Sequence, residues 1–154
     1  MKIQHILMVA ACMLTHPAVN SSETSEFNKR LIARKLPQGA IQKIIIKERS
    51  AKSFSKESYC QELVIDEKRI LFFLRHAKPD NEYNYSQEGL TGDCSAEGLV
   101  VFKDGRKVQV AIDNATGSGV AMNYRTTYYM RCEACEGILQ PDFSFDPHKR
   151  SDWR

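Results

Sequence analysis

The sequence predicts a single small α+β domain, in which an antiparallel sheet of hairpins packs against one main helix and two disulfides hold the chain together. Three observations predict it: short β-branched segments separated by turn residues, one amphipathic helical stripe, and four cysteines beyond an N-terminal apolar segment. The 154 residues suit one domain, and 42% hydrophobic with 27% charged residues excludes wholesale disorder. A net charge of +3 is too balanced to predict nucleic-acid binding.

Residues 1–21 are predicted to be a signal peptide. Ile6–Leu14 are nine uncharged apolar residues, a length typical of a signal-peptide core and far short of the about 20 residues that span a membrane. Cleavage before Ser22 would leave a domain of residues 22–139 and a polar C-terminal tail of residues 140–154. We therefore expect a periplasmic or secreted protein.

Two other interpretations of the N-terminal segment stay open. Val9-Ala10-Ala11-Cys12 is similar to a bacterial lipobox, in which Cys12 would be acylated and would anchor the chain to a membrane. Against this, Cys12 lies early and the apolar run continues past it. The other interpretation is a buried N-terminal helix.

The four remaining cysteines predict two disulfides. Cys60, Cys94, Cys132 and Cys135 lie in a chain predicted to be exported, where thiols are oxidised. Four cysteines allow three connectivities, and the sequence does not choose between them. We favour Cys60–Cys94 with Cys132–Cys135.

The N-terminal half of the domain reads as a short helix followed by β segments. Phe27, Leu31 and Ile32 have the spacing of a helix over residues 22–35, and Leu36–Gly39 interrupts it. Three further segments follow: a strand over 41–48, a Ser- and Lys-rich loop over 49–58, and a short strand over 63–65.

The main helix is predicted over residues 66–78. Asp66 is in an N-cap position, and one apolar stripe repeats at helical spacing through Ile70, Phe73, Leu74 and Ala77. Pro79 ends the helix. Residues 79–93 then read as a long polar loop that carries Tyr83 and Tyr85.

A β-hairpin is predicted around Asp104-Gly105. The Asp-Gly pair indicates a two-residue type I′ turn. In that register Val101 faces Val108 and Leu99 faces Val110, which places these four side chains on one face of the hairpin. Two more strands are predicted over 119–123 and 126–132, after a small-residue loop over 114–119, and the tail from Gln140 is expected to fray.

The cysteines and their surroundings resemble those of small exported bacterial proteins of uncharacterised function with four similarly spaced cysteines. The likeness rests on Cys60, the Phe-Leu-Arg-His-Ala end of the main helix, Cys94, Phe102–Gly105 and Tyr128–Cys135, and covers about residues 58–137. The resemblance implies a bacterial periplasmic setting and transfers no catalytic residue.

The Cys132-Glu133-Ala134-Cys135 motif has three interpretations: a structural disulfide, a thiol–disulfide exchange site, or half of a zinc site. Exchange needs a thiol of lowered pKa, usually at a helix N-terminus, whereas this motif follows a predicted strand and contains Glu133. Zinc needs two more ligands, and neither a second CxxC nor suitably spaced histidines are present. A structural disulfide is favoured, and we expect no metal and no cofactor.

Catalytic templates are missing from the sequence. It contains no GxSxG, no HExxH and no well-spaced carboxylate pair, and Ser118 is followed by a predicted strand where a nucleophile elbow needs a helix. His76 reads as a solvated or helix-capping residue. Asn114-Ala115-Thr116 is a glycosylation sequon that a bacterial periplasm would leave unused.

These observations favour a non-enzymatic protein that binds a secreted or envelope-acting enzyme and blocks it, as an immunity protein or an inhibitor. Expected contact residues are Tyr83 and Tyr85, because tyrosine is a frequent interface anchor, with Thr116 and Ser118. The segment 114–119 is similar to the Ser-Gly loop that periplasmic lysozyme inhibitors insert into an enzyme cleft. The alternatives are a structural envelope domain, membrane-bound only if Cys12 is lipidated, and a thiol–disulfide oxidoreductase using Cys132 and Cys135.

Overall fold

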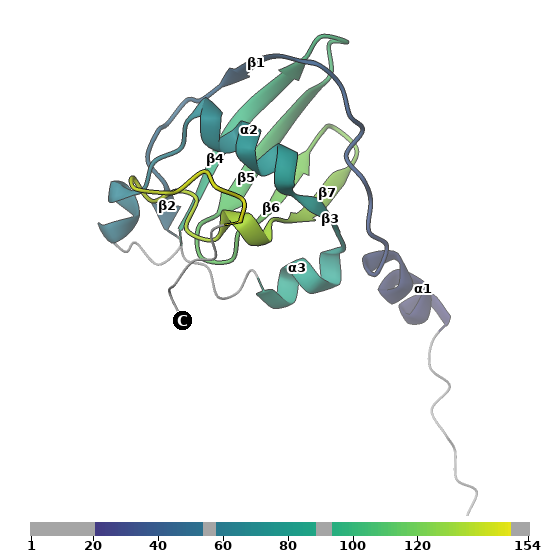
Figure 1. The fold of residues 1–154 in the computed structure, drawn as a ribbon. Helices are drawn as coiled ribbons and strands as arrows, with labels where there is room; N and C mark the ends of the chain where they lie inside the picture. Colours follow the sequence, from purple (N-terminus) through teal and green to yellow (C-terminus); the bar gives the residue numbers. More distant parts are fainter. Residues whose placement is uncertain (1–20, 54–57, 89–93, 149–154) are drawn as a thin grey trace, which may run out of the picture.

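An antiparallel sheet forms the framework of the protein. The computed structural model describes residues 21–53, 58–88 and 94–148, and within them seven strands join in the order β1-β4-β5-β6-β7-β3, with β2 also pairing with β4 (Figure 1). The strands are β1 (Ile41–Ile45), β2 (Lys52–Ser53), β3 (Lys78–Asp80), β4 (Cys94–Phe102), β5 (Lys107–Asp113), β6 (Ser118–Met122) and β7 (Thr127–Arg131). The helices are α1 (Ser21–Arg30), α2 (Glu67–His76) and α3 (Glu82–Glu88), with short 3₁₀ segments η1 (Ser58–Glu62) and η2 (Glu133–Cys135). The predicted α+β class, with one main helix and two disulfides, is confirmed.

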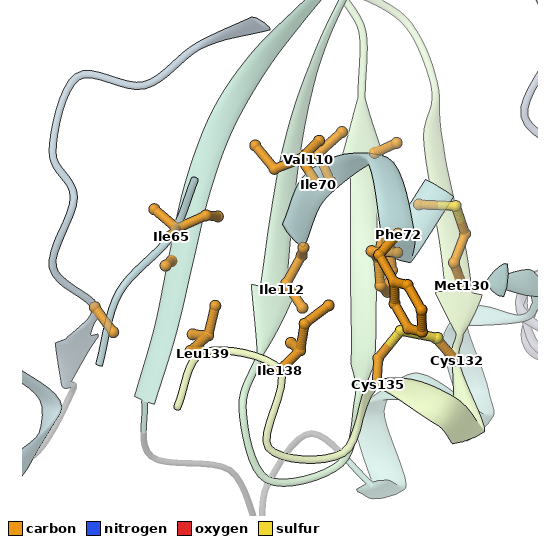
Figure 2. Close-up of a cluster of buried hydrophobic side chains, with 14 of the residues drawn as sticks. Ile65, Ile70, Phe72, Val110, Ile112, Met130, Cys132, Cys135, Ile138 and Leu139 are labelled. Atoms are coloured by element: carbon orange, nitrogen blue, oxygen red, sulfur yellow. A yellow bond between two sulfur atoms is a disulfide. The ribbon is translucent and has the colours of Figure 1, made fainter. Parts of the chain in front are cut away.

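The hydrophobic core lies between α2 and one face of the sheet, which we call the inner face. Ile70 and Phe73 on α2 are fully buried, as are Val110 and Ile112 on β5. Figure 2 shows Ile70, Val110 and Ile112 within this cluster. A Cβ atom at Gly119 would lie 2.6 Å from the Phe73 ring, so this glycine lets the ring approach the sheet closely. Burial of such large apolar side chains is the main source of stability.

The start of α2 is held by the N-cap that the sequence predicts. The Asp66 carboxylate accepts a hydrogen bond from the Arg69 backbone N–H at 2.8 Å and pairs with the Arg69 guanidinium. Arg69 is itself buried, and it donates to the carbonyl of Ile138 at 2.8 Å and to that of Gln140 at 2.7 Å. This arginine therefore fastens the main helix to the C-terminal segment.

The end of α2 comes slightly earlier than predicted. The helix ends at His76, and Lys78–Asp80 form β3, which pairs with β7 at the edge of the sheet. An edge strand tolerates Pro79, because proline has no N–H to donate to a neighbour.

The predicted register of the β4–β5 hairpin is wrong by one residue. Val100, not Val101, faces Val108, and Leu99 faces Gln109. The Gly105 N–H donates to the Phe102 carbonyl, and Gly105 has a φ of +84°, as expected in a three-residue loop with a glycine bulge rather than a two-residue type I′ turn. Because side chains alternate between faces, the slip moves Leu99 off the core face.

The segments before α2 contain more short structure than predicted. The helix and strand near the N-terminus are confirmed but shorter, ending at Arg30 and Ile45. The expected loop over 49–58 contains β2 and the beginning of η1. The expected strand over 63–65 is reduced to an isolated bridge between Ser50 and Val64.

The segment expected to fray after Gln140 instead packs against α2. The rings of Phe143 and Phe145 each meet the ring of Phe72 edge to face at 5.6 Å, and the Lys68 ammonium lies 3.8 Å from the centre of the Phe145 ring. The C-terminal segment, at least as far as Phe145, is therefore part of the cover over the inner face.

The other face of the sheet, the outer face, is covered at one end by α3. Met130 faces the core, so its neighbour Tyr129 points outward, where its ring lies 5.2 Å from that of Tyr85 on α3. The rest of the outer face along β4 and β5 carries no helix in the part of the chain that the structure describes.

Candidate functional site

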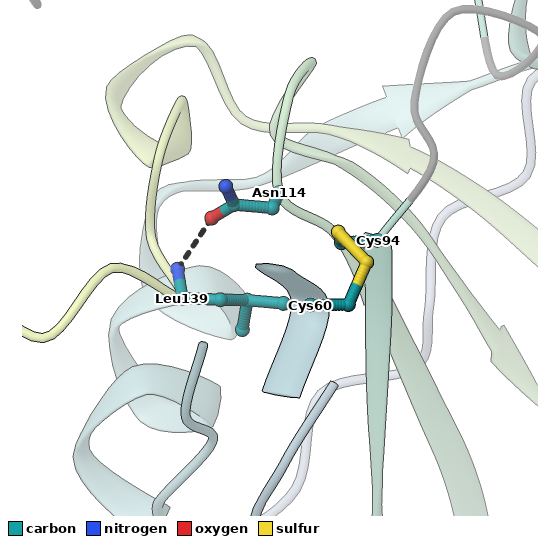
Figure 3. The surroundings of a disulfide bond; sticks show 4 residues. All are labelled: Cys60, Cys94, Asn114 and Leu139. Atoms are coloured by element: carbon teal, nitrogen blue, oxygen red, sulfur yellow. Dashed lines mark hydrogen bonds between the residues drawn. A yellow bond between two sulfur atoms is a disulfide. The ribbon is translucent and has the colours of Figure 1, made fainter. Parts of the chain in front are cut away.

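Both disulfides have the favoured connectivity. Cys60–Cys94 joins η1 to the first residue of β4 across 34 positions of sequence (Figure 3). Cys132–Cys135 closes the CxxC motif (Figure 2). Next to the first bridge, the Asn114 N–H donates to the Cys94 carbonyl at 3.0 Å, and its side-chain oxygen accepts from the Leu139 N–H at 2.8 Å. This bridge thus fixes one end of the sheet together with the C-terminal segment.

The two cysteines of the CxxC motif are buried, whereas Glu133 between them is exposed. Cys132 and Cys135 have no exposed surface, and the Cys135 N–H donates to the Cys132 carbonyl within η2. Backbone also crosses closely over the motif, because a Cβ atom at Gly117 would lie 2.4 Å from the Cys132 oxygen. Thiol–disulfide exchange requires an attacking thiolate to reach a sulfur, and this geometry favours a structural bridge.

The polar groups of the turn that contains Thr116 and Ser118 form hydrogen bonds within the turn itself. One carboxylate oxygen of Asp113 accepts from both the N–H and the hydroxyl of Thr116, at 2.9 and 3.0 Å, and the Thr116 oxygen accepts from the Ser118 N–H. Ser118 is 1% exposed and begins β6, and its hydroxyl has no hydrogen-bond partner among the described residues. Thr116 is half-buried. These two predicted contact residues are therefore placed to stabilise the turn, and Ser118 has almost no surface that a partner could touch.

Tyr83 and Tyr85 lie on a helix, not in the predicted loop. Tyr85 packs on Tyr129, and burial, followed by the charge of Asp113, raises the pKa of its phenol above the ordinary 10.0. Tyr83 is 38% exposed and meets Phe27 of α1 edge to face. Tyr83 thus remains accessible, while Tyr85 secures α3 to the sheet. Residues 89–93 of the expected loop lie outside the described residues.

The most exposed aromatic side chain among the described residues is Tyr124, which the sequence pattern did not single out. Tyr124 is fully exposed at the turn between β6 and β7, flanked by Met122, which is 37% exposed, and by exposed Arg125. We call Met122, Tyr124 and Arg125 the tip. Tyrosine, methionine and arginine are enriched at protein interfaces, and tyrosine and arginine are frequent hot spots.

The tip is rigidly held. The side-chain oxygen of Asn123 accepts from the N–H groups of Arg125 at 2.9 Å and Thr126 at 2.8 Å, and the Asn123 N–H donates to the Thr126 carbonyl. A loop that is ordered before binding loses less entropy when a partner immobilises it. The turn between the two predicted strands was the available signal, because asparagine favours such turns.

A groove on the outer face adjoins the tip. It has a volume of about 590 Å³ and runs along β4 and β5, with Leu99, Gln109 and Ala111 among its lining residues. Gln109 pairs directly with Met122 of the tip, so their side chains lie on the same face of the sheet. The groove and the tip therefore form one continuous surface.

The groove exists because the chain leaves the edge of β4 between β1 and β2. Arg49 and Ala51 pair instead with the segment before α2, through the Ile65 N–H to Arg49 carbonyl bond and the Ala51 N–H to Leu63 carbonyl bond. In the described structure, Ala96–Gly98 of β4 consequently have no strand beside them on this edge.

The groove on the outer face is lined by charged and polar side chains that pair with one another. Lys52 and Glu48 pair at 2.8 Å on the groove wall, and the Gln109 amide donates to Glu97 at 2.5 Å. Serines and side chains of both charges line the groove, and no histidine is among its lining residues.

The described residues contain neither a membrane-spanning helix nor a cluster of metal ligands. Within residues 21–53, 58–88 and 94–148, no helix is long and apolar enough to cross a membrane, and no group of three or more His, Cys, Asp or Glu residues could hold a metal ion. The predicted export segment, with Ile6–Leu14 and Cys12, lies outside these residues. Searches with family models, curated proteins and solved structures found no match for this chain.

Proposed function

We propose that this protein is an exported, non-enzymatic binding protein that blocks a secreted or envelope-acting enzyme, as an immunity protein or an inhibitor does. The single observation that carries the proposal is the rigid tip, where Tyr124 projects fully exposed from a capped turn. A projecting aromatic side chain on a preformed loop suits insertion into a concave site, and an enzyme cleft is such a site.

The setting of the tip supports this role. Its strand β6 pairs on one side with β5 and on the other with β7, whose last residue is followed by the Cys132–Cys135 bridge. Binding residues are often carried on loops that a rigid scaffold positions. The burial of both CxxC cysteines speaks against the oxidoreductase alternative.

The test begins with capture of a partner. Mature protein, beginning at Ser22, is immobilised and exposed to periplasmic and secreted extract, and a retained enzyme is identified by mass spectrometry. Its activity is then measured against increasing concentrations of the protein. We expect a saturable loss of activity, with no turnover by the protein itself.

Variants of two exposed tyrosines locate the contact. Tyr124→Ala should weaken binding by about 2 kcal/mol or more, which corresponds to about 30-fold in Kd. Its melting temperature should not change, because the ring is fully exposed. Tyr83→Ala tests the contact predicted from the sequence, and it should weaken binding less than Tyr124→Ala does.

Three outcomes would contradict the proposal. No loss of affinity from Tyr124→Ala would remove the tip from the contact. Retention of no enzyme at all would favour a structural envelope domain. An insulin-reduction activity that Cys132→Ser abolishes would establish the oxidoreductase alternative.

A further inference from the structure

A second cavity lies between α2, the edge of the sheet and the chain that leads into β1. It has a volume of about 330 Å³, which is at the lower end of the range of small-molecule sites. Phe102 and Met130, both buried core residues, belong to its lining, as do Leu71 and Leu74 of α2. Leu71 is 39% exposed, so the protein leaves a large apolar side chain uncovered there.

One wall of the cavity is formed by residues 35–39, which the β4–β5 hairpin holds in place. The Arg106 guanidinium donates to the carbonyls of Pro37 at 3.1 Å and Gln38 at 3.2 Å, and the Lys103 N–H donates to the Ala40 carbonyl at 2.8 Å. The same guanidinium lies over the Phe102 ring, 4.6 Å from its centre. The cavity is therefore preformed, which lowers the entropic cost of filling it.

The charged residues of the cavity are of one sign. Lys35 and Arg75 line it and are exposed, and no acidic residue lines it in the part of the chain that the structure describes. Neither cation forms an ion pair with a described residue. An apolar interior with unpaired cations is complementary to a molecule with an aliphatic tail and an anionic head.

We propose that this cavity is a binding site for a small anionic amphiphile, with the tail against Leu71, Leu74 and Met130 and the acidic head at Arg75 and Lys35. This site is separate from the tip, since none of the tip residues lines it. The proposal therefore stands or falls independently of the proposed enzyme-blocking role.

Two surfactants of similar tail length and opposite head charge provide the probes. Decanoate and decyltrimethylammonium are titrated into the mature protein by isothermal calorimetry, each below its micellar concentration. We expect saturable binding of decanoate and at least about tenfold weaker binding of the cation, because a charge-assisted contact forms with only one of them.

A charge reversal sharpens the test. Arg75→Glu should weaken decanoate by about tenfold or more and strengthen decyltrimethylammonium. Arg34→Glu is the matched control, since this exposed cation lies next to Lys35 in sequence but does not line the cavity, and it should change neither affinity. Leu71→Glu should also weaken decanoate, and a retained cooperative melting transition shows that this variant is folded.

The result that overturns the proposal is equally specific. Equal affinity for both surfactants, equal effects of Arg75→Glu and Arg34→Glu, or no saturable binding of decanoate would each exclude an anionic amphiphile. Persistence of the melting transition in every variant shows that the protein remains folded in each comparison.

Discussion

The two faces of the sheet are built from the same strands but differ in burial: the inner face packs into the core and the outer face is largely open to solvent. Along β4, the inner positions Ala96, Val100 and Phe102 are buried beneath α2 and the C-terminal segment, whereas Glu97 and Leu99 between them look outward over the groove. The inner face holds the core. The outer face, with the tip at its end, presents polar and apolar groups to solvent. Alternation along a strand thus lets stability and binding be changed separately.

The largest effect should come from a cavity on the inner face. Phe73→Ala removes a fully buried ring and should lower the free energy of unfolding by about 4 kcal/mol. Met122→Ala, on the outer face and 37% exposed, should cost less than about 1 kcal/mol. Urea denaturation followed by circular dichroism measures both, and similar losses would remove the distinction between the faces.

Loss of a disulfide should have the next largest effect. The two bridges can be compared with each other because they close chain segments of very different length. Replacing Cys60 and Cys94 together by alanine releases a 34-residue separation and should cost about 3 kcal/mol, since the stabilisation grows with the length of the closed loop. The same change at Cys132 and Cys135, three residues apart, should cost about 2 kcal/mol. The opposite ranking, measured by denaturant titration, would show that packing around the buried CxxC outweighs chain entropy.

The turn that sets which β4 residues face inward should give a smaller effect. Gly105 has a φ of +84°, a conformation that β-branched residues rarely adopt, so Gly105→Val should destabilise by about 2 kcal/mol. No atom lies within 4 Å of the position of a Cβ there, so the loss reports backbone strain and not a collision. Lys107→Val, two residues along and exposed, should be nearly neutral. Equal melting temperatures for the Gly105→Val and Lys107→Val variants would contradict the positive φ of Gly105 in this turn.

The smallest effect concerns α3 on the outer face. Burial raises the pKa of Tyr85 in the folded protein, so its contribution to stability is complete below the ordinary 10.0 and is lost as the pH rises through the folded value. Tyr85→Phe cannot ionise and should show a smaller loss of stability between pH 9 and pH 11 (about the range around a phenol's ordinary value). Urea midpoints across this range test it, and identical pH profiles for the two proteins would count against burial of the phenol.

The features predicted well from sequence are those with a strong local cause. Asp66 followed by the stripe through Ile70 and Phe73 predicts α2, and four cysteines in a chain predicted to be exported indicate two bridges. The register failed because Leu99 to Phe102 are all apolar, so alternation does not distinguish the two faces there. The Asp-Gly pair is compatible with hairpin loops of two or of three residues. The one-residue difference in loop length determines which side chains of β4 face the core.

Other features depend on contacts that a local pattern does not contain. The segment of α3 has no apolar stripe, and the helix is secured by Tyr85 on Tyr129 and by the ion pair of Glu82 with Arg30 at 3.2 Å. The groove arises because residues 49–51 pair away from β4, which no spacing along the chain reveals. The strands on either side of Tyr124 were predicted, but its complete exposure became evident only once they were paired.

The order of the strands has a consequence for the sequence in which the fold can assemble. The edge strand β3 precedes most of the sheet in sequence, yet its only partner in the described structure is β7, with Lys78 opposite Arg131. The carbonyls that anchor Arg69, those of Ile138 and Gln140, follow later still. A chain that becomes available from its N-terminus can therefore pair β4 with β5 early, but it cannot close this edge of the sheet or fasten the main helix until residues 131–140 are present.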